Sequence, residues 1–108
     1  MSLFGDYIKE RLNKEIVESD VGLCTYFFVQ DGVYIEDLYV RPEYRKGHIA
    51  SELADQVAEI ARQKGYTKMY GSVVPSSKGS TSSLKVLLAY GMELESAQQN
   101  AIIMSKGI

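Results

Sequence analysis

The sequence has few of the features that would place a protein in a class at once. Its 108 residues include one cysteine, Cys24, and one histidine, His48. A single cysteine excludes an internal disulfide and is typical of a reducing, cytosolic setting. One cysteine and one histidine are also too few for a metal site built from those residues. The composition therefore predicts neither a disulfide framework nor a bound metal.

Strong net charge and long apolar runs are missing as well. The formal net charge is −2 and the pI is about 5.4, whereas nucleic-acid and anionic-membrane binders are usually basic. No apolar run approaches the roughly 18 to 20 residues of a membrane helix, and the N-terminus lacks a signal-peptide pattern. We expect one globular, cytoplasmic domain over residues 1–108 that binds neither nucleic acid nor membrane.

The hydrophobic pattern predicts a chain in which helices and strands are mixed. Apolar residues at four-residue spacing indicate amphipathic helices, and runs rich in β-branched and aromatic residues indicate strands. The expected order is α-β-β-α-β-α-β-β, with helices over 4–18, 46–64 and 83–91 and strands over 21–30, 33–40, 67–75, 92–97 and 100–105. The strand–helix–strand unit from 33 to 75 favours a parallel, right-handed pair. The fold class is thus α/β or α+β, a mixed central sheet covered by helices.

Positive charge gathers in the turn before the long central helix. Arg41, Arg45 and Lys46 precede this helix, and no Ser, Thr, Asp or Asn in the turn at 45–48 is placed to cap it. A helix start leaves N–H groups free and carries a partial positive charge, so this turn suits a phosphate or pyrophosphate. Gly47 lets a ligand approach the backbone closely, and Ala50 keeps the first turn unobstructed. The alternative is a solvated turn in which water caps the helix.

Two common phosphate-binding motifs, G-x-x-x-x-G-K-[ST] and G-x-G-x-x-G, do not occur, which argues against P-loop and Rossmann-type nucleotide binding. The segment "IEDLYVRPEYRKGHIASELADQVAEIA", residues 35–61, instead resembles the acetyl-CoA-binding motif of the GNAT superfamily of N-acetyltransferases. In that motif a strand, a Pro-x-Tyr-Arg turn and a glycine-containing loop lead into a long helix. The order of elements from about residue 20 onward is also similar to the family core.

The resemblance implies a fold and a co-substrate. It implies a GNAT-like mixed sheet in which the strand over 33–40 splays from the strand over 67–75 and receives acetyl-CoA, with no metal. Backbone groups of the first of these strands would bond the pantetheine arm, and the loop at 45–50 would hold the pyrophosphate. His48 would then lie beside the pyrophosphate and away from the thioester, so it is not expected to be the base. The residues implied to bind the co-substrate are Leu38, Tyr39, Val40, Arg45, Lys46, Gly47, His48, Ile49, Ala50, Ser51 and Ser80.

Acetyl transfer to an amine needs a base for the amine and an acid, or solvent, for the leaving thiolate. Glu36 stands where similar family members, polyamine acetyltransferases among them, carry a glutamate proposed as the base. Until any bulge, strand alternation would place Glu36, Leu38 and Val40 on one face and Asp37 on the other. The tyrosine usual at the acid position is Leu87 here, and Tyr90 is the nearest replacement. The alternatives are an exposed carboxylate without a role and a tyrosine that only packs at a helix end.

Three functions remain open at this level. The first is an N-acetyltransferase that uses acetyl-CoA and an amine of unknown identity. The second is a degenerate GNAT domain that binds acyl-CoA or a protein partner without catalysis. The third is an assembly module whose sheet edge pairs with another chain. In the family, an N-terminal strand and helices usually wall the acceptor site, and here they are shortened to one helix. The resemblance therefore implies an acceptor pocket that is open, completed by a second subunit in a homodimer, or suited to a macromolecule.

Overall fold

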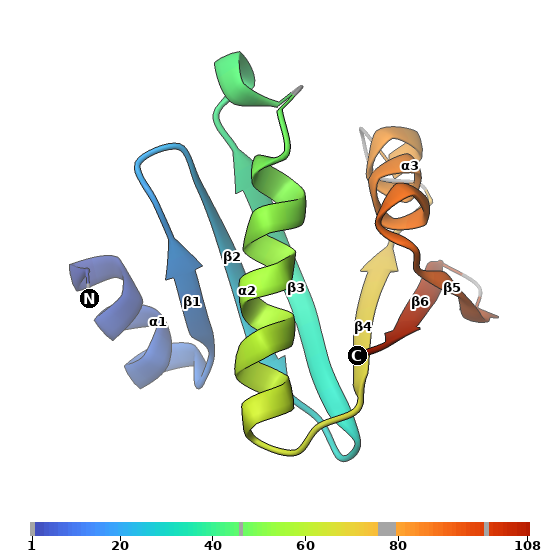
Figure 1. Cartoon of the computed structure of the whole chain (residues 1–108), viewed down its shortest axis with the longest axis horizontal. Helices are drawn as coiled ribbons and strands as arrows, with labels where there is room; N and C mark the ends of the chain where they lie inside the picture. Colours follow the sequence, from blue (N-terminus) through green and yellow to red (C-terminus); the bar gives the residue numbers. More distant parts are fainter. Residues whose placement is uncertain (1, 46, 76–79, 99) are drawn as a thin grey trace.

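The computed structural model describes residues 2–45, 47–75, 80–98 and 100–108, with side chains for all of these except 80–83 and 98. A six-stranded sheet in the order β1-β2-β3-β4-β6-β5 forms the centre of the molecule. Figure 1 shows α2 lying across β2 and β3, α3 beside β4, and α1 next to β1. The elements are α1 (Leu3–Leu12), β1 (Glu15–Glu18), β2 (Gly22–Phe28), β3 (Gly32–Val40), a short 3-10 turn (Pro42–Tyr44), α2 (Ile49–Gln63), β4 (Lys68–Val73), α3 (Ser80–Tyr90), β5 (Glu93–Gln98) and β6 (Ala101–Gly107).

The predicted mixed sheet is confirmed, but the first predicted helix is too long. Helix α1 ends at Leu12 because Asn13 adopts the left-handed conformation, with φ 54°, and ends the helical hydrogen bonding. Asparagine tolerates that conformation better than most residues. The chain then turns back, and Ile16 lies in β1 opposite Thr25 of β2. A spacing of four residues also fits the two-residue period of a strand, so the apolar pattern alone could not exclude β1.

The parallel strand pair that positions the candidate site is β3 and β4. It was predicted from the strand–helix–strand pattern, and α2 makes the connection. The paired residues run from Gly32 opposite Lys68 to Ile35 opposite Gly71. Both strands continue beyond this point, β3 as far as Val40, without further pairing to each other. Figure 1 shows the two strands diverging toward the end where α2 begins, which is the predicted splay.

A β-bulge interrupts β3 at the same place. Thr25 of β2 stands opposite Asp37, whereas the next residue, Tyr26, stands opposite Ile35. Glu36 is therefore the extra residue and has no counterpart in β2. A bulge bends its strand and increases the local twist, so it turns the second half of β3 away from the direction of β4.

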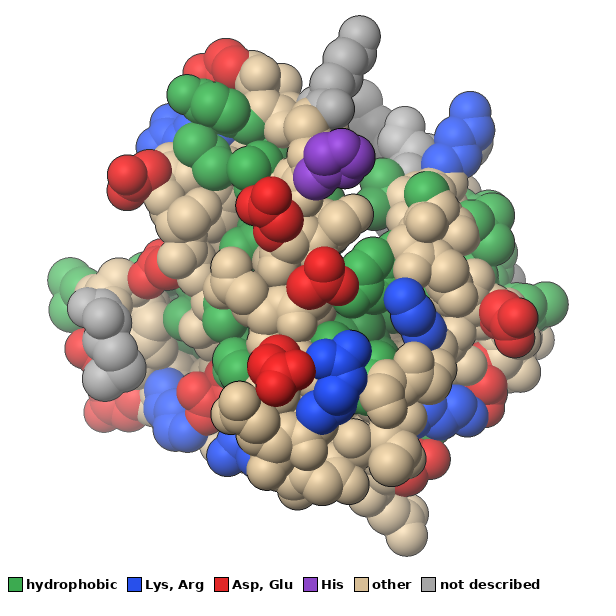
Figure 2. All heavy atoms as spheres, in the orientation of Figure 1, with side chains coloured by type: hydrophobic (Ala, Val, Ile, Leu, Met, Phe, Trp, Pro, Cys, Tyr) green, Lys and Arg blue, Asp and Glu red, His purple; other side chains and the backbone are tan. Residues whose placement is uncertain are grey.

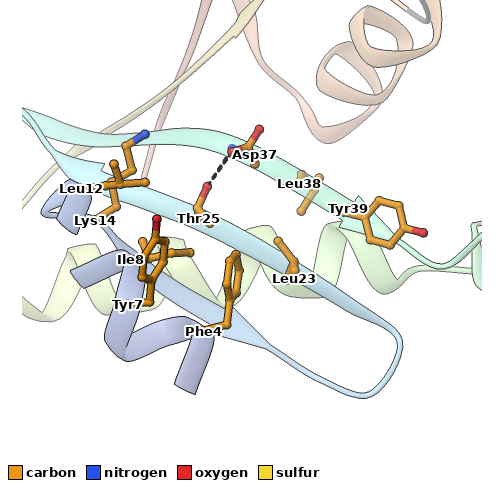
Figure 3. A pocket seen from close by; sticks show the side chains of 10 residues that line it. All are labelled: Phe4, Tyr7, Ile8, Leu12, Lys14, Leu23, Thr25, Asp37, Leu38 and Tyr39. Atoms are coloured by element: carbon orange, nitrogen blue, oxygen red, sulfur yellow. Dashed lines mark hydrogen bonds between the residues drawn. The ribbon is translucent and has the colours of Figure 1, made fainter. Parts of the chain in front are cut away.

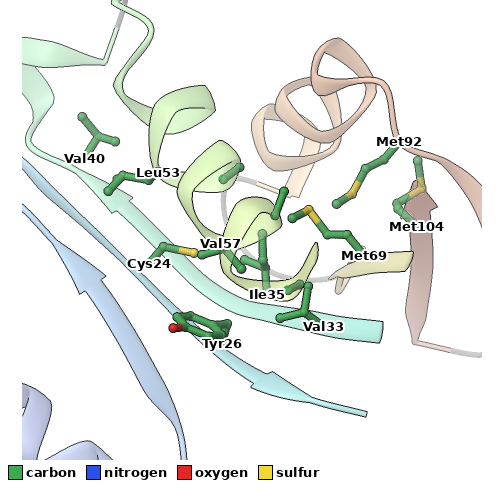
Figure 4. Packing of buried hydrophobic residues seen from close by; sticks show 13 residues of the cluster. Cys24, Tyr26, Val33, Ile35, Val40, Leu53, Val57, Met69, Met92 and Met104 are labelled. Atoms are coloured by element: carbon green, nitrogen blue, oxygen red, sulfur yellow. The ribbon is translucent and has the colours of Figure 1, made fainter. Parts of the chain in front are cut away.

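The core lies between α2 and the sheet (Figure 4). Leu53 and Val57 of α2 are buried there, as the periodicity of the helix predicted. Cys24 is fully buried in the same cluster, and burial first, then the charge of Asp37, raises the pKa of its thiol to about 12. A thiol with so high a pKa is scarcely ionised near neutral pH and is a poor nucleophile. The lone cysteine is therefore a core residue.

Within the described ranges, no helix is long and apolar enough to cross a membrane. The same residues contain no group of three or more His, Cys, Asp or Glu side chains that could hold a metal ion.

Candidate active site

A cavity of about 680 Å³ opens where β3 and β4 part, and we call it the slot. Its walls come from the second half of β3, the start of α2, part of β4 and the last turns of α3. Figure 2 shows hydrophobic side chains in a crease between α2 and α3, with charged side chains along its margins. The predicted site residues that line the slot are Glu36, Leu38, Tyr39, Val40, Arg45, Ala50, Ser51 and Tyr90. Tertiary structure thus brings together groups that the sequence places up to 54 residues apart, from position 36 to position 90.

The start of α2 forms one end of the slot. His48 precedes the helix and its side chain makes no capping hydrogen bond. The first-turn N–H groups, from Ile49 to Ser51, have no carbonyl within the helix to bind, and the helix dipole adds a partial positive charge there. The N–H of Gly47 differs, because it donates to the Tyr44 carbonyl at 3.3 Å. Among the described residues, the amides suited to an anion are thus those of the helix start.

Arg45 is the described cation at the edge of the slot. Its Nε donates to the Val40 carbonyl at 2.8 Å, and its guanidinium carbon lies 5.5 Å from the centre of the Tyr39 ring. Arg41 points elsewhere, since its Nε donates to the Asp20 carbonyl in the turn between β1 and β2 at 2.8 Å. The predicted cluster of cations is therefore divided, and Arg45 is the arginine placed to meet an anion in the slot.

Two predicted positions fall outside what the structure describes. Lys46 lies outside the described residues, as does the side chain of Ser80, whose backbone begins α3. Their predicted contacts with a co-substrate stay predictions.

The bulge changes how the two neighbouring carboxylates point. Glu36 borders the slot, yet its Oε2 lies 2.5 Å from Nζ of Lys14. The backbone N–H of Asp37 donates to Oγ1 of Thr25 at 3.1 Å, and Asp37 does not line the slot. The expectation that Asp37 points away from the slot is met. The alternation was expected only as far as any bulge, and the bulge falls here, where the extra residue Glu36 pairs with Lys14.

A second cavity, of about 440 Å³, lies on that other side of the sheet, and we call it the α1 pocket (Figure 3). Side chains of α1, β2 and β3 form it, and most of them are apolar. Leu38 and Tyr39 line both cavities, so β3 alone separates the slot from the α1 pocket at this level. The residues around the α1 pocket are Phe4, Tyr7, Ile8, Leu12, Lys14, Leu23, Thr25, Asp37, Leu38 and Tyr39.

Neither the α1 pocket nor the place of Lys14 was predicted from the sequence. The pocket depends on where α1 ends and on how the chain folds back into β1. The helix predicted over 4–18 included neither this end nor the strand. Recognising the left-handed tendency of Asn13 would have located that helix end.

Tyr90 and Leu87 form the α3 side of the slot. The hydroxyl of Tyr90 donates to Oδ1 of Asp55 in α2 at 2.7 Å, and Nζ of Lys106 lies 4.2 Å from the centre of its ring. Burial, followed by the hydrogen bond to Asp55, raises the pKa of Tyr90 well above its ordinary value. Leu87 packs beside Gly71, where an added Cβ would lie 3.5 Å from Cδ2 of Leu87. Tyr90 thus connects α3 to α2 by a hydrogen bond, and it also lines the slot.

Comparisons with known proteins agree with this geometry. The sequence profile of the Acetyltransferase (GNAT) family matches residues 12–85. Thialysine N-epsilon-acetyltransferase from Sus scrofa is 35% identical over 72 residues, which cover 62% of this chain and 42% of that protein. The enzyme of the same name from Caenorhabditis elegans is 31% identical over 68 residues, 58% of this chain and 42% of its own length. The chain therefore spans less than half the length of these relatives.

Solved structures share the fold at low sequence identity. The PaiA N-acetyltransferase from Thermoplasma acidophilum, in complex with coenzyme A, superposes with a TM-score of 0.77 at 18% identity, covering 98% of this chain and 69% of that one. A GNAT family acetyltransferase from Elizabethkingia anophelis with acetyl-CoA bound gives a TM-score of 0.73 at 16% identity, covering 95% and 82%. The likeness extends over nearly the whole chain.

Proposed function

Because this chain belongs to the acetyltransferase (GNAT) family, we propose that it transfers an acetyl group from acetyl-CoA to an amine. One observation carries the proposal: the slot at the parting of β3 and β4 joins an uncapped helix start to a carboxylate, Glu36. The relatives named thialysine N-epsilon-acetyltransferase support an amine as the acceptor class. The neighbours solved with coenzyme A or acetyl-CoA support the co-substrate.

The residues of the slot fit the chemistry of acetyl-CoA. A pyrophosphate needs hydrogen-bond donors and positive charge, which the start of α2 and Arg45 offer. A pantetheine arm carries amide groups, and β3 beyond Ile35 has no pairing to β4 on the slot side. An unpaired strand edge binds an extended amide chain as an added strand would. Leu38, Tyr39 and Val40 supply that edge. Ala50 and Ser51, in the first turn of α2, line the end of the slot that we assign to the pyrophosphate.

Glu36 is the residue we assign to proton removal. An amine is protonated near neutral pH and must lose a proton before it can attack a carbonyl carbon. Among the carboxylates of the described residues, Glu36 is the one that borders the slot, and it pairs with Lys14, which lines the α1 pocket. When bound, acetyl-CoA supplies the activated acyl group. Leu87 and Met92 form an apolar wall that limits water near that group.

Calorimetric titration with acetyl-CoA tests the proposed co-substrate. We expect saturable binding by the native chain and at least about 10-fold weaker binding by Arg45→Glu, because a carboxylate beside a pyrophosphate replaces attraction by repulsion. Arg62→Glu is the matched control, since Arg62 lies in the last turn of the same helix and pairs with Glu59 at the surface. Its affinity should stay within about twofold of the native value.

Two outcomes of that experiment would count against the proposal. Absence of binding by the folded native chain would remove the acetyl-CoA assignment. Binding without acetylation of any amine in a broad screen would favour the domain that binds acyl-CoA without catalysis.

Tyr90→Phe tests whether Tyr90 acts as the acid. A phenol whose pKa is raised, and which already donates to Asp55, is a poor proton donor to a thiolate. We therefore expect turnover to stay within about threefold of the native rate, with solvent protonating the thiolate. The free energy of unfolding should fall by about 1 to 2 kcal/mol, since a hydrogen bond to a charged partner is lost. If turnover instead fell about 100-fold at unchanged stability, the acid role would belong to Tyr90.

A further inference from the structure

The ion pair between Lys14 and Glu36 connects a residue of the α1 pocket to a residue of the slot. Lys14 lines the α1 pocket, Glu36 lines the slot, and their charged groups are 2.5 Å apart. The amine of Lys14, a residue of the α1 pocket, thus contacts the carboxylate that borders the slot and that we assign to proton removal. From this arrangement we infer that the chain acetylates its own Lys14, an inference that rests on the proposed acetyl-CoA-dependent function.

Local structure holds Lys14 in this place. The turn at Asn13 ends α1, and the backbone N–H of Lys14 donates to the Ile8 carbonyl at 3.5 Å. The next residue, Glu15, pairs with Tyr26 of β2, which in turn pairs with Ile35, the neighbour of Glu36. The side chain of Lys14 is 22% exposed, whereas that of Lys9, which pairs with Glu15 at the surface, is 62% exposed. Lys14 is therefore directed at Glu36 and is not a freely solvated lysine.

The other ion pairs of the described residues show that this placement is specific. Lys9 with Glu15, Arg62 with Glu59 and Lys68 with Glu95 are also paired, but none of these residues lines the slot. A surface ion pair contributes little to stability. Stability alone therefore does not explain why a lysine lies beside a cavity. What distinguishes Lys14 is that its partner borders the slot.

The chemistry needs only groups already named and acetyl-CoA. Lys14 begins as an ammonium, and one of its protons passes to the Glu36 carboxylate. The neutral Nζ then attacks the thioester carbonyl carbon, so that an N–C bond forms and the C–S bond breaks. A second proton leaves the nitrogen and is taken up by the coenzyme A thiolate. The products are acetyl-Lys14, coenzyme A as its thiol and one proton that Glu36 returns to solvent. The four-carbon stem of lysine is flexible enough for a short advance from Glu36 into the slot.

Peptide mapping by mass spectrometry tests the inference. The full chain is incubated with acetyl-CoA without any added amine, and acetylation is followed with time at each lysine. We expect Lys14 to be modified at least about 100-fold faster than Lys9 or Lys68, the lower end of what a positioned base contributes. The first-order rate should not depend on protein concentration, because the acceptor belongs to the same chain.

Two variants serve as controls. In Glu36→Gln the rate at Lys14 should fall to that of Lys9 and Lys68. In Lys14→Arg, which keeps the positive charge, the rapid increase in intact mass should disappear. Calorimetric affinity for coenzyme A, which does not depend on turnover, is measured for both variants and should match the native value.

The outcomes separate this inference from the proposed function. If coenzyme A binds and an added amine is acetylated, but Lys14 reacts no faster than Lys9 and Lys68, the inference is wrong and the proposed function stands. Acetylation of Lys14 at the same rate in Glu36→Gln also overturns the inference, because the reaction then needs no base from the chain. If neither coenzyme A nor acetyl-CoA binds, both fail together.

Discussion

Replacing Glu36 by Gln is expected to lower kcat for amine acetylation by about 10²- to 10⁴-fold, the range that a general base contributes. The amide keeps the shape of the side chain but cannot accept the proton of the amine. Affinity for acetyl-CoA should stay within about twofold, because Glu36 lies on β3 beside Lys14 and not at the start of α2. Steady-state kinetics with any amine that proves to be a substrate, together with calorimetry, measure the two quantities.

Asp37→Asn is the matched control for Glu36→Gln. Asp37 is the adjacent carboxylate, of similar size and charge, but it lies toward Thr25 and does not line the slot. We expect its turnover rate to fall by less than about 10-fold. If Asp37→Asn slowed the reaction as much as Glu36→Gln, or more, the assignment of the base to Glu36 would be wrong.

Replacing Gly32 by Ala is expected to destabilise the fold by about 3 kcal/mol, at the upper end of what overpacking costs. A Cβ at Gly32 would lie 2.3 Å from the carbonyl oxygen of Lys68 and 3.2 Å from Cε2 of Tyr70. The first of these neighbours is backbone in the parallel ladder between β3 and β4, so relief requires the strands to separate. For a domain of this length, such a loss lowers the melting temperature by about 10 °C or more.

Gly107→Ala provides a close comparison. Gly107 of β6 pairs with the same Lys68 from the other side of β4, and a Cβ there would meet nothing within 4 Å. We expect its free energy of unfolding, measured by urea denaturation, to lie within about 0.5 kcal/mol of the native value. Equal urea midpoints for the two variants would mean that β3 and β4 do not approach each other as closely as Gly32 implies.

Most of the fold could be predicted from the sequence because its signals are local. The amphipathic pattern of α2, the β-branched and aromatic runs of β2 and β3, and the strand–helix–strand order required no knowledge of distant contacts. Gly65, which has φ 89°, lies just beyond the end of α2, a place where glycine is common. The long helix predicted over 4–18 was wrong over residues 13–18, because Asn13 adopts a left-handed conformation and the apolar period also fits a strand.

The candidate site was predictable in part for the same reason. Residues from Leu38 to Ser51 are close in sequence, so one motif could imply that they act together. Those that do line the slot are Leu38, Tyr39, Val40, Arg45, Ala50 and Ser51. Two side-chain positions depended on contacts that the sequence does not reveal. Tyr90 meets Asp55 of another helix, and Lys14 meets Glu36 across the bulge in β3.

Local sequence signals were enough for the order of elements from β2 onward, the parallel connection through α2 and the resemblance of residues 35–61 to a GNAT motif. The first two rest on hydrophobic periodicity and turn residues, and the third on residues that match a known motif. That Glu36 is an extra residue in β3 emerged from the folded sheet, because a bulge is defined by the register of two strands and not by either one. The place of Lys14 beside Glu36 likewise required the folded chain, since the reversal at Asn13 brings together two residues that are 22 positions apart.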